Sequence, residues 1–317
     1  MVSFQEVKLE LPMVRENVPL RNHTTFKIGG PAKYFFIART SQDIQKAVAT
    51  AIKLSLPYFL LSGGSNVLIS DKGFNGLVIK IQNTEYTIEK HTVRADSGVS
   101  MTTLVRETTQ RGLAGLEWAG GLPGTVGGAI RGNAGAFGGE IKDAIISAQA
   151  IDEKGTVKMF SKQECEFSYR NSIFKQKNFV VLNSNFLLRL GNKEQLQKIA
   201  KEHIKYRKER HPLEYPNAGS IFKNCDVKKV SKKVQKQFAD VVKEDPFPVI
   251  PTAAILSAVQ LQGLRVGDAQ ISDKHPNYIV NRGNATSKEV TQLIKNVQQR
   301  IKKTYNINLE AEIQFVL

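Results

Sequence analysis

The stretch GLPGTVGGAIRGNAGAFGGEIKD, from Gly121 to Asp143, is dominated by glycine and alanine. Glycine loses more conformational entropy on folding than any other residue, so a run of this kind needs a compensating use. One such use is to bring backbone N–H groups close to a ligand, above all a phosphate or a pyrophosphate. A flexible linker would instead be rich in serine and other polar residues. Leu122, Val126 and Ile130 interrupt the glycines, which predicts an ordered, packed loop.

A second glycine-rich segment, Ser62–Asn66 (SGGSN), directly follows the apolar run PYFLL, which predicts a buried strand. Two separate backbone cradles suit a dinucleotide with a central pyrophosphate. The sequence has neither a P-loop nor the GxGxxG fingerprint, so phosphate would have to be held in another way. It also lacks HExxH and GxSxG, and its five histidines have no zinc-ligand spacing, so no metal site is predicted.

The chain of 317 residues has a formal net charge of +16, which attracts polyanions in principle. Three interpretations are open: general charge balance, attraction of an anionic small substrate, or nucleic-acid binding. Much of the lysine lies in segments that resemble solvated helices, such as 192–210 and 228–243, and such runs are usually soluble faces. No zinc-finger spacing and no RRM-like aromatic motif supports nucleic acid, so we expect no nucleic-acid partner.

No apolar run approaches membrane-spanning length, and the N-terminal sequence lacks a signal-peptide pattern. Cys165 and Cys225 are too few for a disulfide framework and form no CxxC pair. These features predict a cytoplasmic protein without a membrane partner, and we expect a monomer.

The length favours two or three domains. We expect a βαββ-type region at 1–80, a second region at 81–210 and a third at 211–305, with an alternating terminal strand (306–317) that returns to the second region. Strands are expected at 34–38, 57–61, 76–81, 87–95, 145–152, 156–161 and 178–190, and helices at 40–55, 100–112, 192–210, 253–261 and 287–303.

Eight segments, in order, resemble the UDP-N-acetylenolpyruvoylglucosamine reductase family, and together they span nearly the whole chain. Each motif alone is weak, whereas the ordered set is highly specific. They are NHTTFKIGGPA (22–32), LLSGGSNVL (60–68), AGGLPGTVGGA (119–129), GNAGAFGGE (132–140), FSYRNSIFK (167–175), NAGSIFKN (217–224), GDAQISDKHPNYIVN (267–281) and LEAEI (309–313).

The resemblance implies an α+β fold of the vanillyl-alcohol-oxidase (PCMH) type, in which two α+β subdomains clasp FAD and a smaller C-terminal α+β domain binds substrate. It implies an NADPH-dependent oxidoreductase that reduces UDP-N-acetylenolpyruvoylglucosamine to UDP-N-acetylmuramate for peptidoglycan. No histidine lies between His91 and His203, so FAD is expected to be noncovalent. The segment between Tyr169 and Asn183 is short, which resembles the family branch without an inserted substrate-closing loop.

The resemblance also implies the catalytic residues. Reduction of an enol ether that carries a carboxylate builds an enolate-like charge, which needs a cationic group, a second stabilising group and a proton donor. Arg170 in SYRNS matches the arginine, and Ser220 in AGSIFKN matches the proton donor. Glu312 in LEAEI matches the C-terminal glutamate, which has to carry or share a proton to help. Glu310 lies two residues earlier, so on a strand it would point to the same face, and it is the alternative to Glu312.

The remaining site residues are carried over from the same motifs, although any one glycine could serve tight packing alone. Those implied for FAD are Gly63, Gly64, Ser65, Asn66, Val67, Pro123, Gly124, Thr125, Gly127, Gly128, Ala129, Gly135 and Ala136. Those implied for substrate are Arg207, Arg210, Lys223, Asn224, Gln270 and Asn281.

The sequence departs from the family pattern after FKN, where Cys225 replaces the usual proline, and in the lysine-rich segment 226–248, which suggests a surface insertion. Cys225 is expected to be a packed thiol rather than a catalytic one. Two alternatives to the reductase remain: an FAD-dependent alcohol or lactone oxidase of the same fold, and a nonenzymatic basic protein that binds nucleic acid. The catalytic set argues against the oxidase, since fold alone does not separate the two enzymes.

Overall fold

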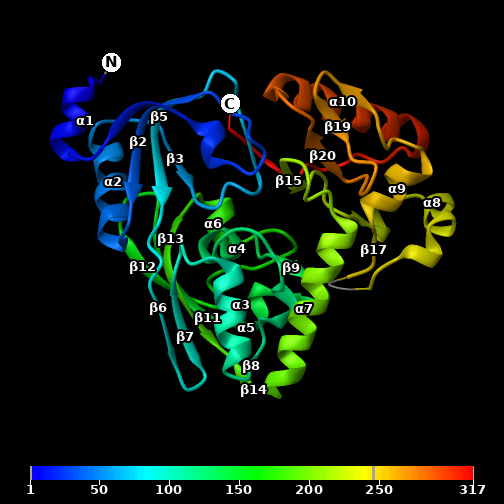
Figure 1. Cartoon of the computed structure of the whole chain (residues 1–317), viewed down its shortest axis with the longest axis horizontal. Helices are drawn as coiled ribbons and strands as arrows, with labels where there is room; N and C mark the ends of the chain where they lie inside the picture. The colour runs from blue at the N-terminus through cyan, green and yellow to red at the C-terminus, as the bar shows by residue number, and fades with distance from the viewer. Residues whose placement is uncertain (1, 245–246, 317) are drawn as a thin grey trace. The chain divides into compact units, whose positions relative to one another are not determined.

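The computed structural model describes residues 2–244 and 247–316, which form two compact units (Figure 1). The first unit comprises residues 1–18, 32–63 and 74–207, and the second comprises 19–31, 64–73 and 208–317. The first unit therefore contains most of the two regions predicted to bind flavin, apart from two short segments that belong to the second unit. The boundary at 63/64 divides the segment Ser62–Asn66, hereafter the first glycine loop.

One sheet of the first unit has the strand order β1-β2-β5-β3, in which β2, β5 and β3 are parallel. Helix α2 begins after Thr40, whose hydroxyl accepts the Asp43 amide in a capping box, and it buries Ile44, Ala47 and Val48. The helix predicted at 40–55 is thereby confirmed. The elements are α1 (Phe4–Glu10), β1 (Arg15–Pro19), β2 (Pro31–Ala38), α2 (Ser41–Lys53), β3 (Tyr58–Leu61) and β5 (Phe74–Ile81).

The second sheet of this unit is antiparallel, with the order β12-β11-β13-β7-β6. A hairpin turn joins β11 to β12, between the strands predicted at 145–152 and 156–161, and Asp152 accepts the backbone N–H groups of Lys154 and Thr156 there. The strands are β6 (Tyr86–Glu89), β7 (Thr92–Asp96), β11 (Ile145–Ile151), β12 (Val157–Ser161) and β13 (Val180–Leu187). The short strands β8 (Leu113–Ala114) and β14 (Arg189–Leu190) form a separate two-stranded sheet.

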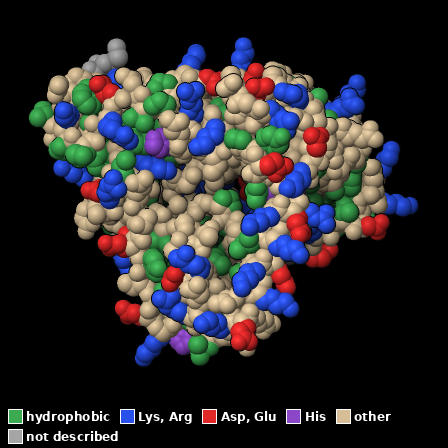
Figure 2. All heavy atoms as spheres, in the orientation of Figure 1, with side chains coloured by type: hydrophobic (Ala, Val, Ile, Leu, Met, Phe, Trp, Pro, Cys, Tyr) green, Lys and Arg blue, Asp and Glu red, His purple; other side chains and the backbone are tan. Residues whose placement is uncertain are grey.

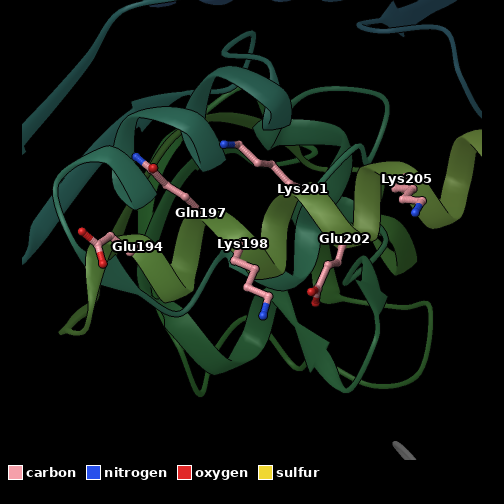
Figure 3. Close-up of a pocket in the computed structure, with 6 residues that line it drawn as sticks. All are labelled: Glu194, Gln197, Lys198, Lys201, Glu202 and Lys205. Carbon is pink, nitrogen blue, oxygen red and sulfur yellow. The ribbon is translucent and has the colours of Figure 1, made fainter.

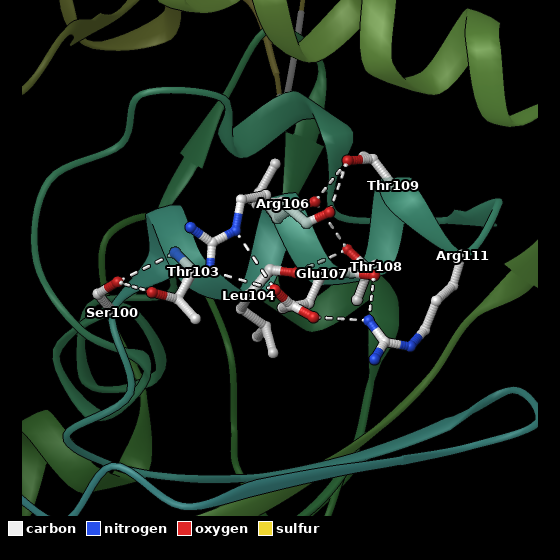
Figure 4. Close-up of polar contacts among 9 residues, drawn as sticks. Ser100, Thr103, Leu104, Arg106, Glu107, Thr108, Thr109 and Arg111 are labelled. Carbon is white, nitrogen blue, oxygen red and sulfur yellow. Dashed lines mark hydrogen bonds and ion pairs between the residues drawn. The ribbon is translucent and has the colours of Figure 1, made fainter.

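Helix α3 (Met101–Gln110) packs its apolar face into the core beside this sheet. Ser100 caps it by accepting the Thr103 amide at 3.0 Å, and Glu107 forms ion pairs with Arg106 and Arg111 on the exposed face (Figure 4). Gly112, with φ +67°, ends the helix as predicted. The Met101 amide donates to the Gly124 carbonyl at 3.1 Å, so the start of α3 also anchors the glycine-rich stretch.

The glycine-rich stretch is ordered, as predicted, and contains short elements. The elements from there to the end of the unit are η2 (Glu117–Ala119), α4 (Val126–Arg131), β9 (Gly135–Ala136), β10 (Gly139–Glu140), α5 (Ile141–Ala144), α6 (Ile173–Gln176) and α7 (Lys193–Arg210). Segment 123–129 is hereafter the second glycine loop.

The second unit is built on an antiparallel sheet of order β15-β20-β19-β18. Helix α10 (Ser287–Tyr305) covers its apolar side, burying Val290, Leu293 and Val297. Its other elements are η1 (Leu20–His23), β4 (Val67–Ile69), β15 (Asn217–Ser220), β16 (Cys225–Asp226), η3 (Val227–Lys229), α8 (Lys232–Gln237), η4 (Ala239–Val241), β17 (Val249–Ile250), α9 (Thr252–Ala258), β18 (Arg265–Val266), β19 (Ala269–Ile271), β20 (Tyr278–Asn281) and β21 (Gln314–Val316).

The terminal strand was predicted to join the second region, and that prediction is wrong. Among the described residues of the segment, β21 pairs in parallel with β4, with Gln314 opposite Val67 and Val316 opposite Ile69. Ile307, Leu309 and Ile313 are buried in the core of the second unit, which draws the segment to that unit. Alternation along a strand predicts its two faces but carries no information about which edge it pairs with.

The lysine-rich segment 226–248 differs from the predicted surface insertion. Its described residues form short helical turns, and Val234 and Phe238 are only 4% and 6% exposed within the core of the second unit. Its lysines lie on the other side of these turns and are mostly exposed. The segment therefore contributes to the core of the unit as well as to its basic surface.

On the face that Figure 2 shows, the positive charge is dispersed. Figure 2 shows basic side chains scattered over the visible face, with acidic ones among them. Along α7, a shallow hollow of about 420 Å³ is lined by a mixture of acidic, amide and basic side chains: Glu194, Gln197, Lys198, Lys201, Glu202 and Lys205 (Figure 3). The mixed signs favour a solvated face over an anion-binding surface. In the described part of the chain, no helix is both long and apolar enough to span a membrane.

Candidate functional site

The two glycine loops touch in the first unit through Gly63 and Gly124. A Cβ placed on Gly63 would lie 2.8 Å from the Gly124 Cα, a distance too short for two carbon atoms. The neighbouring hydroxyls of Ser62 and Thr125 are 2.5 Å apart and share a hydrogen bond. The absence of side chains at this contact lets the two backbones meet, so the loops form one continuous surface of main chain.

The glycines of the second glycine loop have different roles. A Cβ on Gly127 would lie 2.7 Å from the Ser97 Cβ, whereas one on Gly128 would meet nothing closer than the Thr125 hydroxyl at 3.8 Å. The amides of Val126 and Gly127 donate to the carbonyls of Val99 and Ser97, so they are satisfied within the protein. Gly127 therefore serves packing, and Gly128 leaves open space on the loop. Exposed main chain of this kind fits a pyrophosphate-containing cofactor.

Asn83, which the sequence reasoning missed, holds the support of this loop in place. Its side chain is fully buried, accepts hydrogen bonds from the Ser97 hydroxyl and the Gly98 amide, and donates to the Leu182 carbonyl. The Ser97 carbonyl in turn accepts the Gly127 amide at 2.8 Å. A buried asparagine with both ends of its amide engaged is a rigid support for the loop.

We expect Gly63→Ala to weaken FAD binding by about tenfold or more, because the added methyl group forces the two loops apart. Titration of the flavin-free protein with FAD, followed by quenching of flavin fluorescence, measures the effect. The matched control is Gly132→Ala, where the new Cβ would meet only the Gly128 carbonyl oxygen at 3.7 Å. Equal affinities of the two variants would contradict the role assigned to the Gly63–Gly124 contact.

The rest of the first glycine loop belongs to the second unit. Gly64 has φ +65°, and its carbonyl accepts the Thr25 amide at 3.0 Å. A Cβ on Gly64 would lie 2.4 Å from the His23 carbonyl oxygen, so only glycine fits there. Ser65 and Asn66 lead into β4. The first residue of β4, Val67, is paired with Gln314 of β21. Within the second unit, segments 22–31 and 64–68 thus pack together, and the first holds the second.

Arg170 lies in a strained loop of the first unit. Its φ is +55°, and its guanidinium donates to the Gly135 carbonyl at 2.9 Å. Asn133 connects the same two segments, since its side-chain amide donates to the Ser168 carbonyl and to Glu140. The structure therefore brings Arg170 together with Gly135, and with Ala136 beside it in β9. Backbone strain of this kind persists only where surrounding contacts fix it, and it is concentrated at functional sites.

Ser220 and Glu312 lie on adjacent segments of the second unit. The Glu312 amide donates to the Ile221 carbonyl at 2.8 Å, and the Lys223 amide donates to the Glu310 carbonyl at 2.9 Å. Ser220 is half-buried, and in the described part of the chain its hydroxyl has no hydrogen-bond partner within the protein. The serine and the glutamate thus come from two neighbouring segments, 220–223 and 310–312, that pair through backbone hydrogen bonds and are hereafter called the ladder.

The first glycine loop reaches the same ladder. The Asn66 side chain donates to the Glu312 carbonyl at 3.2 Å, and the Asn66 carbonyl accepts the Gln314 amide at 3.0 Å. A Cβ on Gly219 would lie 3.8 Å from the Ser65 carbonyl oxygen. In the second unit, a loop predicted to bind flavin, the predicted proton donor and the predicted glutamate are therefore neighbours.

The structure distinguishes the two glutamates that the sequence left as alternatives. Glu310 is exposed, with a side-chain exposure of 70%, and it forms an ion pair with Lys223. Glu312 is half-buried and follows Ala311, which is bridged to Phe222. The environment of Glu310 is that of a surface ion pair, which contributes little free energy.

The predicted substrate residues differ in their surroundings. Arg207 donates to the Gly120 carbonyl at 3.0 Å and lies over the Phe137 ring, so it holds the start of the glycine-rich stretch, while Arg210 is exposed. Asn281 donates to the Phe26 carbonyl and accepts two backbone amides, which is the pattern of a structural hydrogen-bonding residue. Gln270 is 9% exposed and donates to Asp273.

Asn224 and the two cysteines complete the predicted set. The Asn224 side chain accepts the Thr252 amide at 3.2 Å. Cys225 lies 3.7 Å from the Thr252 hydroxyl, and burial raises the pKa of its thiol. Burial also raises the pKa of the Cys165 thiol, to about 12. Both thiols are free, and Cys225 is partly buried and packs against the core of the second unit, which agrees with the prediction of a packed thiol.

Comparison with known proteins identifies both parts of the chain. Residues 32–161 match the family described as "FAD binding domain", and residues 211–316 match "UDP-N-acetylenolpyruvoylglucosamine reductase, C-terminal domain". The matches confirm the predicted α+β flavoprotein fold of the vanillyl-alcohol-oxidase type, with FAD as the cofactor.

Whole-length relatives agree with these two matches. The chain is 36% identical over 323 residues to a UDP-N-acetylenolpyruvoylglucosamine reductase of Lachnoclostridium phytofermentans, covering 99% of this chain and 97% of the relative. It is 36% identical over 310 residues to the enzyme of that name from Clostridium novyi, covering 97% and 94%. The crystal structure of the reductase (MurB) from Thermus caldophilus is similar, with a TM-score of 0.77, 29% identity and coverage of 96% of this chain and all of that one. The chain belongs to the UDP-N-acetylenolpyruvoylglucosamine reductase family.

Proposed function

We propose that this protein is the reductase that converts UDP-N-acetylenolpyruvoylglucosamine to UDP-N-acetylmuramate, with FAD as cofactor and NADPH as electron donor. The observation that carries the proposal is the ladder of the second unit, where Ser220 and Glu312 lie on paired segments next to the first glycine loop. Full-length relatives that bear the name of this reductase support it.

FAD fits the two glycine loops, because the Gly63–Gly124 contact and the open space at Gly128 leave main chain accessible. The residues that would hold it are those predicted from the two loops and from β9. When bound, reduced FAD supplies the hydride for the vinyl carbon of the substrate.

Arg170 would bind the carboxylate of the enolpyruvyl group. As the substrate is reduced, charge spreads from the α-carbon into that carboxylate, and a guanidinium offers a permanent, planar positive charge for it. The hydrogen bond to the Gly135 carbonyl fixes one edge of the Arg170 guanidinium, so the group is oriented before substrate binds.

Ser220 would donate a proton to the α-carbon. A serine hydroxyl is a weak acid in water, but the enolate-like carbon is a strong base, and the transfer needs only a well-placed donor. No neighbouring histidine is positioned in sequence to make Ser220 a nucleophile. A hydroxyl with no internal hydrogen-bond partner in the described part of the chain suits this role.

Glu312 would stabilise the same developing charge by a shared proton, with its position fixed by the backbone pairing to Ile221. Lys223 and Asn224 follow Ser220 along the chain and, together with Arg207, Arg210, Gln270 and Asn281, are the proposed contacts for the anionic groups of the substrate. The internal hydrogen bonds of Asn281 make it the weakest member of this set. We further propose a cytoplasmic monomer, in keeping with two free thiols.

Anaerobic absorption spectroscopy of the purified protein tests the proposal. NADPH should bleach the flavin bands, and the enolpyruvyl sugar nucleotide should then restore them without oxygen. Bands that bleach but return only with oxygen would favour an oxidase and reject this substrate. A protein that remains colourless after incubation with FAD would contradict the flavoenzyme assignment itself.

A further inference from the structure

Lys80 is a charged residue in a place where apolar residues are usual. It lies in β5, the strand between β2 and β3, opposite Ile37 on one side and Leu61 on the other. Strands flanked on both sides in a parallel sheet are typically continuous apolar runs. Lys80 interrupts such a run, since Leu77, Val78 and the other residues just before it are buried.

The ammonium of Lys80 contacts the first glycine loop. Its Nζ donates a hydrogen bond to the Ser62 carbonyl, one residue before Gly63. Lys80 lies near the carboxyl end of its strand, which is the edge where open sheets with parallel strands bind ligands. The hydroxyl of the same Ser62 meets Thr125 of the second glycine loop. The Lys80 ammonium is therefore hydrogen-bonded to Ser62, the residue through which the two glycine loops are linked.

This cation has no acidic partner among the residues that the structure describes, whereas many other lysines of the chain form ion pairs on the surface. Burial lowers the pKa of the Lys80 ammonium, because the charged form is poorly solvated. A half-buried charge that is hydrogen-bonded to a single carbonyl carries an uncompensated desolvation cost. An anion bound at the adjoining loops would remove that cost.

We propose that Lys80 is a cofactor-positioning residue: it fixes the Ser62 carbonyl and compensates the charge of the FAD pyrophosphate held by the glycine loops. The role explains why a charge is present on a central strand. It rests on the flavin loops proposed above and adds a residue from outside their motifs. It also implies that Lys80 contributes to cofactor affinity rather than to the stability of the flavin-free protein.

The test compares three variants of the full chain after removal of flavin. Lys80→Met keeps the length of the side chain and removes the charge, while Lys80→Arg keeps the charge. Lys33→Met is the matched control. Lys33 is also half-buried and lies in the same sheet, but near the amino end of β2 and over the Tyr34 ring, whereas Lys80 lies opposite Ile37 near the carboxyl end of β2. FAD affinity is measured by fluorescence quenching at several salt concentrations, and stability by thermal unfolding.

We expect Lys80→Met to weaken FAD binding about ten- to hundredfold and to reduce its salt dependence. The Tm of the flavin-free variant should stay within about 3 °C of the wild type, because the lost hydrogen bond is offset by relief of desolvation. Lys80→Arg should retain most of the affinity, and Lys33→Met should bind FAD like the wild type.

Three results would overturn the role of Lys80: FAD affinity in Lys80→Met equal to that in Lys33→Met, equal losses in Lys80→Met and Lys80→Arg, or a large drop in the Tm of the flavin-free Lys80→Met protein. Each would show that packing, and not charge, matters at this position. Failure of the wild-type protein itself to bind FAD would overturn the proposed function along with this inference, so the two failures are distinguishable.

Discussion

The Ser220→Ala variant is expected to retain its flavin and the reduction of that flavin by NADPH, yet to turn over about 10²- to 10⁴-fold more slowly than the wild type. The reason is that the hydroxyl acts only in the proton transfer to carbon, after the flavin has been reduced. Stopped-flow spectroscopy separates the two steps, since flavin reduction by NADPH and flavin reoxidation by the enolpyruvyl sugar nucleotide are followed independently.

Ser257→Ala is the control for this experiment. Ser257 is an exposed serine of the same unit whose hydroxyl accepts a hydrogen bond from Gln262, so its loss should leave both steps unchanged. Normal reoxidation in Ser220→Ala would remove Ser220 from the mechanism. A loss of flavin reduction would instead indicate that the variant disturbs the first glycine loop, to which Gly219 is adjacent.

Glu312→Ala is expected to lower kcat by about 10²- to 10³-fold, the range seen when one group that stabilises a developing oxyanion is removed. The fold should survive, because the variant keeps the backbone amide of residue 312, which donates to the Ile221 carbonyl. Steady-state oxidation of NADPH in the presence of the sugar nucleotide measures the effect, and circular dichroism checks that the variant is folded.

Glu310→Ala is the matched comparison, since it removes the same group two residues away. The Glu310 side chain is exposed and its ion pair with Lys223 lies at the surface, so kcat should change by less than about threefold. A larger loss in Glu310→Ala than in Glu312→Ala would reverse the assignment. It would make the exposed carboxylate the functional one and Lys223 its partner in the reaction.

Local sequence patterns predicted the elements of the first unit well. The helix starts at Thr40 and Ser100, the helix end at Gly112 and the break between the strands at 145–152 and 156–161 all lie where the sequence placed them. These features depend on contacts between residues close together in the chain, which a single sequence records directly.

Long-range pairing was not predictable in the same way. The terminal strand could be recognised by its alternation, but its partner, β4, contains only three residues and lies far away in sequence. Likewise, no local signal marks Asn83 as the support of Ser97, because the two meet only through tertiary structure. Lys80 did leave a signal, a charge within the apolar run GLVIKI, although only the structure shows that its ammonium contacts Ser62.

The parallel pairing of β21 with β4 has a consequence for the order in which contacts form while the protein is synthesised on the ribosome. The partner strand of β4 and the glutamate next to it are synthesised well after the first glycine loop, since Glu312 lies 246 residues after Asn66. Chains emerge from the N-terminus and fold as their contacts become available. Asn66 thus awaits the backbone of Glu312 and Gln314 until that segment has been synthesised. The first glycine loop is therefore completed late, and a nascent chain that stalls before residue 312 leaves that loop without its partner segment.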